Sequence, residues 1–127
     1  MSMRILVAED EALIRLDLVE MLSEAGYEIV AQASNGAEAI ELVEMHKPDL
    51  AIMDINMPIM DGLTAAEKIV NSTPVLMLTA FSQRDLVMKA SEIGVMGYVV
   101  KPFTINDLVP AMEVAASRFK VMSELTK

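Results

Sequence analysis

The sequence contains no cysteine, which excludes disulfide bonds and thiolate metal sites. That absence fits a reducing compartment, and we expect a cytoplasmic protein. Long hydrophobic runs are also missing. The first ten residues hold one arginine and then the short run Ile5 to Ala8, which is too short for a signal peptide. No later run reaches the length of a transmembrane helix, so we expect no membrane association.

Basic residues are scarce. Ten lysines and arginines stand against 19 aspartates and glutamates, which gives a formal net charge of −9. The basic residues are scattered along the chain, whereas a protein that binds nucleic acid directly needs a basic patch. We therefore expect no direct nucleic-acid binding. The acidity favours solubility and also suits a cation site.

The 127 residues are 54% hydrophobic, which is typical of one folded domain rather than a disordered chain. Short apolar runs alternate with helical patterns along the sequence. The apolar runs predict five strands, near residues 5–8, 27–33, 50–53, 75–78 and 97–100. The helical patterns predict five helices, near residues 11–25, 35–46, 61–70, 82–93 and 104–119.

Side chains at the predicted helix ends support these boundaries. Asn35 can cap the second helix with Glu38 as its partner, and Ser82 and Thr104 can cap the fourth and fifth helices. Pro110 lies inside the fifth helix, so we expect a kink or a restart there.

Five alternating strands and helices form a (βα)5 pattern. Continuous apolar strands predict a parallel sheet that helices cover on both faces, a three-layer α/β sandwich. Right-handed crossovers favour the flavodoxin-like strand order 2-1-3-4-5. In such sheets ligands bind beyond the carboxyl ends of the strands, between strands 1 and 3.

Polar side chains stand where four of these strands end. They are three carboxylates, a hydroxyl and an ammonium, from Glu9, Asp10, Asp54, Thr79 and Lys101. Clustered carboxylates repel one another unless a cation lies among them, and Mg²⁺, for which Mn²⁺ could substitute, suits such oxygen ligands. Asp54 could then attack a phosphoryl group in line, with Lys101 neutralising its charge and Thr79 bonding to it.

Each of these residues also has a purely structural interpretation. An Asp after a strand usually caps a helix or turn, and an acidic pair before a helix usually serves the helix dipole. Lys-Pro usually makes a turn, and a Thr at a strand end is usually an ordinary strand residue. The occurrence of all of them at the correct strand ends of one (βα)5 frame favours the joint chemical interpretation.

These motifs resemble the receiver domain of bacterial two-component response regulators. The likeness covers about residues 4–119, and we assign residues 1–120 to a receiver domain and residues 121–127 to a C-terminal tail or the start of a linker. The resemblance implies that Asp54 is the phosphoacceptor. It also implies that Asp10, Asp54 and the main-chain carbonyl of Asn56 bind Mg²⁺, and that Glu9, where many members have Asp, acts through a metal-bound water.

The resemblance assigns further roles around this site. Thr79 and Lys101 match the family's switch hydroxyl and lysine, and the Lys101–Pro102 peptide is expected to be cis. Tyr98 matches the aromatic switch position, and the alternative interpretation is a strand tyrosine with one exposed edge. Asn56 and Phe81 match positions that tune how readily water reaches the acyl phosphate, and we expect Phe81 to slow hydrolysis.

The resemblance also implies partners. The phosphoryl group would come from a sensor histidine kinase or a phosphotransfer protein, and the signal would pass to an output domain or a downstream protein in transcription regulation. The surface of the fourth helix, fifth strand and fifth helix would switch, and in many members it forms homodimers. The stretches at 8–15, 78–86 and 101–103 look like the receivers of ANTAR-type regulators, which carry an RNA-binding antiterminator bundle.

Three other functions compete with phosphoacceptance. A pseudo-receiver would use the same fold as a constitutive interaction module, but such proteins usually lack one or more of the five site residues. A phosphohydrolase of the haloacid dehalogenase type has Asp-x-Asp after its first strand, whereas Asp54-Ile55-Asn56 follows the third. A nucleotide-binding flavodoxin-like protein needs a glycine-rich loop where Glu9-Asp10-Glu11 stands. We therefore expect no enzyme, beyond catalysis of its own phosphorylation and slow dephosphorylation.

Overall fold

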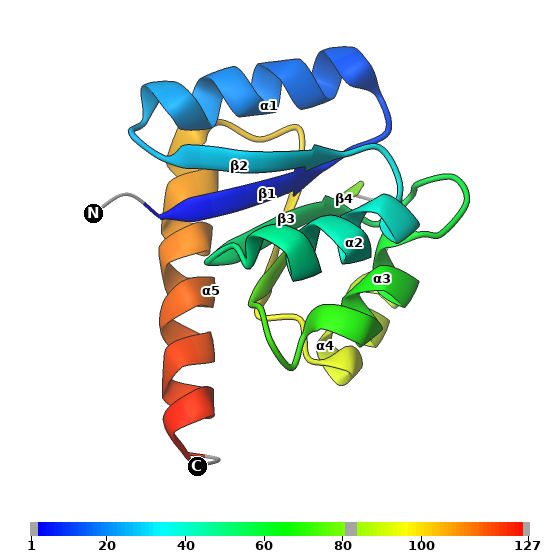
Figure 1. Ribbon diagram of the computed structural model, residues 1–127, viewed down its shortest axis with the longest axis vertical. Coiled ribbons are helices and arrows are strands. Elements are labelled where there is room, and N and C mark those ends of the chain that lie inside the picture. The colour runs from blue at the N-terminus through cyan, green and yellow to red at the C-terminus, as the bar shows by residue number, and fades with distance from the viewer. Residues whose placement is uncertain (1–2, 81–83, 126–127) are drawn as a thin grey trace.

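The computed structural model describes residues 3–80 and 84–125 (Figure 1). Strands and helices alternate along the chain as predicted. The strands are β1 (Arg4–Ala8), β2 (Glu28–Ala33), β3 (Leu50–Asp54), β4 (Val75–Ala80) and β5 (Gly97–Lys101). The helices are α1 (Ala12–Glu24), α2 (Gly36–His46), α3 (Gly62–Ile69), α4 (Arg84–Ile93) and α5 (Ile105–Leu125). All strand pairs are parallel in the order β2-β1-β3-β4-β5, so the predicted topology is confirmed.

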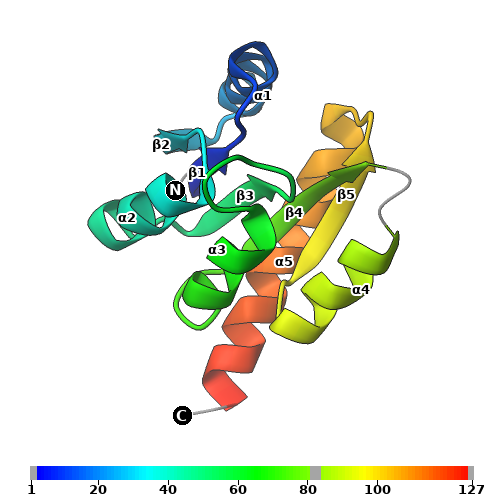
Figure 2. The same ribbon diagram turned by 90° about the vertical axis from the view of Figure 1, so that its right-hand side faces the viewer.

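Helices cover both faces of the sheet (Figure 2). Successive strand residues point to opposite faces, so each central strand contributes to two separate cores. Leu6 and Met53 pack in the core under α2, α3 and α4. Their chain neighbours Val7 and Ile52 pack in the core under α1 and α5. This double burial explains why the strands read as continuous apolar runs.

Side-chain capping contacts are present at the starts of α2 and α5. Asn35 Oδ1 accepts a hydrogen bond from the Glu38 N–H at 2.9 Å, and Glu38 Oε1 accepts one from the Ser34 N–H at 2.8 Å. At α5 the reciprocal contact is made by Asp107, whose Oδ2 accepts from the Thr104 N–H at 2.9 Å. Ser82, the predicted cap of α4, lies outside the described residues.

The end expected for α5 was wrong, because the helix runs to Leu125 instead of about residue 119. It continues through Pro110 without a restart, while a kink there stays a prediction. The buried positions Leu108, Met112 and Ala115 lie on both sides of the proline, and their packing offsets the single lost backbone bond. Residues 119–125 contain neither glycine nor proline, so the helix continues past the point where its buried pattern fades.

The apolar patterns also placed three strand ends early. The sequence pattern predicts strands that end near residues 53, 78 and 100, but β3 ends at Asp54, β4 at Ala80 and β5 at Lys101. The polar side chains of Asp54 and Thr79 are buried, which a periodicity argument does not anticipate. Within residues 3–80 and 84–125, no helix is long and apolar enough to cross a membrane.

Candidate functional site

Three carboxylates meet at the carboxyl edge of the sheet. The neighbouring strands β1 and β3 pair Ala8 with Met53, so the following residues, Glu9 and Asp54, lie side by side. Glu9 is 1% exposed and Asp54 is 6% exposed, whereas Asp10 faces solvent. One carboxylate oxygen from each lies within 4.8 Å of the other two. The clustering predicted from the strand ends is therefore present.

Lys101 supplies a cation to this cluster. It ends β5, two strands away from β3, and its long side chain reaches past β4. The ammonium Nζ donates to Glu9 Oε1 at 3.1 Å and to Asp54 Oδ2. Burial lowers the pKa of Lys101, but hydrogen bonds and attraction from Asp54 and Glu9 outweigh it, so the pKa lies above its ordinary value. The ammonium therefore stays charged between two carboxylates.

The surroundings of Glu9 disfavour the charged form of its carboxyl group. Burial, a side-chain hydrogen bond with Asp54 and the charge of Asp54 raise the pKa of Glu9 to about 7. The Glu11 N–H, which donates to Glu9 Oε2 at 3.2 Å, and the Lys101 ammonium oppose this rise. Without a further cation the negative charges are incompletely compensated. A carboxyl with such a pKa is typical of a functional site.

The predicted switch residues differ in burial, because the Thr79 hydroxyl is buried and the Tyr98 ring is exposed. Thr79 is 1% exposed, lies one residue beyond the strand partner of Asp54, and donates from Oγ1 to the Ala80 carbonyl at 3.2 Å. Tyr98 is 52% exposed on β5, so its ring is turned to solvent. Phe81 lies outside the described residues. The Lys101–Pro102 peptide bond is cis, as expected.

Sequence reasoning missed three contacts that shape the site. Arg15 of α1 donates from Nη1 to the main-chain carbonyl of Glu9 at 2.6 Å. Gly62 donates to the Ile55 carbonyl at 2.8 Å, and Gly36 donates to the Met60 carbonyl at 2.8 Å. The two glycines bind the connection from β3 to α3, one near its start and the other near its end. Only the fold brings Gly36 to it, so no local pattern in the sequence could have revealed that contact.

The donor set fits a hard divalent cation. Carboxylate oxygens at one edge, with two of the three carboxylates buried, are the ligands that Mg²⁺ takes while it keeps several waters. The Asn56 N–H donates to Asp54 Oδ1 at 3.0 Å, which places the main chain of Asn56 beside the same carboxylate. Asp10, Asp54 and this main chain could hold the ion, which would compensate the excess negative charge.

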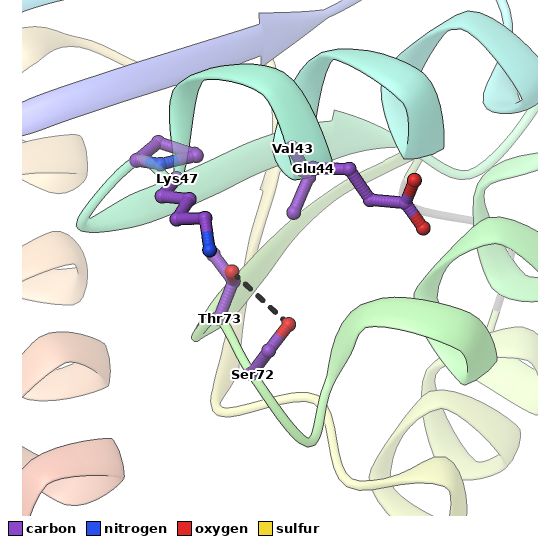
Figure 3. A pocket seen from close by; sticks show the side chains of 6 residues that line it. Val43, Glu44, Lys47, Ser72 and Thr73 are labelled. Carbon is purple, nitrogen blue, oxygen red and sulfur yellow. Dashed lines mark hydrogen bonds between the residues drawn. The ribbon is translucent and has the colours of Figure 1, made fainter.

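A hollow far from these carboxylates involves none of the predicted site residues. A cavity of about 470 Å³ lies between the C-terminal end of α2 and the turn before β4 (Figure 3). Ser72 and Thr73 line it on one side, with their hydroxyl oxygens 3.5 Å apart, and Glu44 and Lys47 line it on the other. A second cavity of about 470 Å³ adjoins Lys101, between α1 and the start of α5. Of the two, only the second adjoins the charged cluster.

Known proteins are similar to this chain in sequence and in fold. The sequence model described as the response regulator receiver domain matches residues 5–113. The chain is 59% identical over 124 residues to the transcriptional regulatory protein PdtaR of Mycobacterium tuberculosis, a match that covers 96% of the chain and 60% of that relative's length. It is 38% identical to the chemotaxis protein CheY of Bacillus subtilis, covering 88% of the chain and 96% of that protein. A solved response regulator receiver domain protein from Clostridium thermocellum has a TM-score of 0.86 and 28% identity, covering 96% of this chain and 99% of that one.

Proposed function

Because the chain belongs to the response regulator receiver domain family, a family of signalling domains in two-component systems, we propose that Asp54 is its phosphoacceptor. One observation carries this assignment. Asp54 is the carboxylate at the end of a central strand that also contacts the Lys101 ammonium and lies in the acidic cluster. Such a carboxylate has both a nearby cation for the incoming charge and an electrostatic reason to bind a metal.

The reaction is a transfer of one phosphoryl group. A carboxylate oxygen of Asp54 attacks phosphorus and forms an acyl phosphate, while the bond from phosphorus to the donor breaks and the donor keeps that electron pair. Lys101 contacts the attacking carboxylate and is placed to neutralise charge on the phosphoryl oxygens. Thr79, at the end of the neighbouring strand, would bond to the transferred group.

The cation in this proposal is Mg²⁺, which receiver domains generally use, and Mn²⁺ could substitute. Asp10, Asp54 and the main-chain carbonyl of Asn56 would bind it directly, and Glu9 would act through a bound water. When bound, the ion supplies positive charge for the phosphoryl oxygens. Asn56 and Phe81 would tune the lifetime of the acyl phosphate, and Phe81→Ala would shorten it.

Signalling would then pass through the surface of α4, β5 and α5. The exposed ring of Tyr98 would turn inward when the Thr79 hydroxyl moves onto the phosphoryl group, as a shift between two packings. A sensor histidine kinase or phosphotransfer protein would donate the group in the cytoplasm. The receiver would act on an output domain, of the RNA-binding antiterminator type, or on a downstream protein, and the same surface would form a homodimer. Its catalysis would be limited to its own phosphorylation and slow dephosphorylation.

Intact mass tests the phosphoacceptor directly. The protein is incubated with acetyl phosphate and Mg²⁺, beside an EDTA control and the Asp54→Asn variant. We expect one phosphoryl addition that requires Mg²⁺ and is lost in Asp54→Asn. No addition while Mg²⁺ demonstrably binds would overturn the proposal and favour a constitutive interaction module.

A further inference from the structure

The connection between β3 and α3, residues 55–61, makes a close main-chain contact with the glycine that begins α2. Gly36, the first residue of α2, donates its N–H to the Met60 carbonyl at 2.8 Å. A Cβ atom at Gly36 would lie 2.4 Å from that carbonyl oxygen and 2.9 Å from the Asp61 carbonyl oxygen. Both neighbours are main-chain atoms, so they cannot rotate away as a side chain would. Only glycine fits this contact.

The same connection is held close to the proposed phosphoacceptor at its other end. Gly62 donates to the Ile55 carbonyl at 2.8 Å, and a Cβ there would lie 2.1 Å from the Asp54 carbonyl oxygen. Between the two glycine contacts, Ile59 has a φ of 66°, which is strained for a β-branched residue. The path of the connection is therefore imposed by its contacts and is not preferred by its own residues.

Helix α2 has little freedom to yield at this contact. The cap of Asn35 fixes its first turn, and Ala39 and Val43 are buried in the core beneath it. The connection, in contrast, has an exposed strained residue at Ile59. An added methyl group at position 36 would consequently displace the connection and leave the helix in place.

We propose that Gly36 is a positioning residue for the metal site, although it lies on a helix that contributes no carboxylate to it. Its close contact with Met60 sets the path of residues 55–61, and thereby the main chain of Asn56 beside the Asp54 carboxylate. The inference rests on the proposed function, because it takes the Asn56 carbonyl as a ligand. Groups that orient metal ligands typically change metal affinity about 10- to 100-fold when they are altered.

The Gly36→Ala variant tests this role against Val43→Ala as a matched control. Both changes affect buried positions of α2, but Val43 lies seven residues further along the helix, away from the Gly36–Met60 hydrogen bond. Mg²⁺ affinity is measured by amide chemical shifts, and phosphorylation by acetyl phosphate is followed across Mg²⁺ concentrations. We expect Gly36→Ala to weaken Mg²⁺ binding about 10-fold, with its phosphorylation rate recovered at saturating Mg²⁺. Val43→Ala should lower the melting temperature and leave the Mg²⁺ affinity unchanged.

A second measurement needs no variant and decides the matter if Gly36→Ala does not fold. In the wild-type protein, hydrogen exchange of the Gly36 amide should slow when Mg²⁺ is added, because its acceptor belongs to the connection that the ion would hold. An Mg²⁺ affinity within twofold of wild type in folded Gly36→Ala, or unchanged exchange at Gly36, would overturn the positioning role. If wild-type protein binds no Mg²⁺ and accepts no phosphoryl group, the proposed function itself fails, which is a distinct result.

Discussion

The two edges of the sheet use charged residues in opposite ways. At the amino edge, Arg4 donates its guanidinium to the His46 and Lys47 carbonyls at 2.9 and 3.0 Å, and its N–H donates to Asp49 Oδ2 at 2.8 Å. Each of these hydrogen bonds gives a partner to a main-chain group at the end of a helix or strand. At the carboxyl edge, three carboxylates cluster, and one ammonium contacts two of them. These charged groups of the amino edge are paired and have a structural role. The carboxyl edge keeps an excess of negative charge that can bind a cation.

The largest effect should come from removing the cation of the carboxyl edge. Lys101→Met takes away the only ammonium that contacts Asp54 among the described residues. We expect phosphorylation by acetyl phosphate, followed by intact mass, to slow about 100-fold or more. Lys47→Met at the amino edge is the control and should react at the wild-type rate. Equal phosphorylation rates in the two variants would contradict a specific role for the ammonium of the carboxyl edge.

Adding Mg²⁺ should stabilise the folded protein through residues of the carboxyl edge and not through those of the amino edge. At about 100 times its dissociation constant, a ligand that binds the folded state alone adds about 2.7 kcal/mol to the free energy of unfolding. Urea denaturation with and without Mg²⁺ should show this gain in the wild-type protein and in Asp49→Asn. Asp10→Asn should lose most of it. A gain that survives in Asp10→Asn would place the ion elsewhere.

The acidity of Glu9 gives a pH test of the same edge in EDTA. Its pKa is raised to about 7 in the folded state from an ordinary value of 4.5, mainly by burial. The folded state therefore binds the proton more tightly, so the free energy of unfolding falls as pH rises from about 4.5 to 7. Glu9→Gln removes this loss and should be more stable than wild type at pH 8, by on the order of 2 kcal/mol.

The advantage of Glu9→Gln should disappear toward pH 4.5, where wild-type Glu9 is protonated in both states. Denaturation curves at several pH values measure the difference between the two proteins. Glu44→Gln, an exposed change at the amino edge, is the control for replacing Glu by Gln. A difference in stability between Glu9→Gln and wild type that stays constant across this range would contradict the raised pKa of Glu9.

The smallest effect is expected at the amino edge itself. Arg4→Met removes two hydrogen bonds to the C-terminal carbonyls of α2 and should lower the free energy of unfolding by about 1 kcal/mol. The Mg²⁺ affinity should remain that of wild type. A changed Mg²⁺ affinity would mean that the two edges are coupled through the sheet and do not act independently.

Much of the molecule follows from local patterns in the sequence. Apolar runs such as Leu50 to Met53 predict buried strands, and Asn35 with Glu38 predicts the start of α2, which the hydrogen bonds confirm. The expected end of α5 was wrong because apolar periodicity reports burial, whereas helix propensity alone continues an exposed helix to Leu125. Strand ends were placed early because Asp54 and Thr79 are polar and yet buried.

By itself, the sequence determined the order of elements, the parallel sheet and the polar residues that follow each strand, because these depend on spacing and burial along the chain. Only the tertiary structure decided how Lys101 reaches past β4 to Asp54 and Glu9. It alone also placed Gly36 against Met60 and raised the pKa of Glu9. These features depend on strand register, on the path of a connection and on the exclusion of water between residues that are distant in the chain.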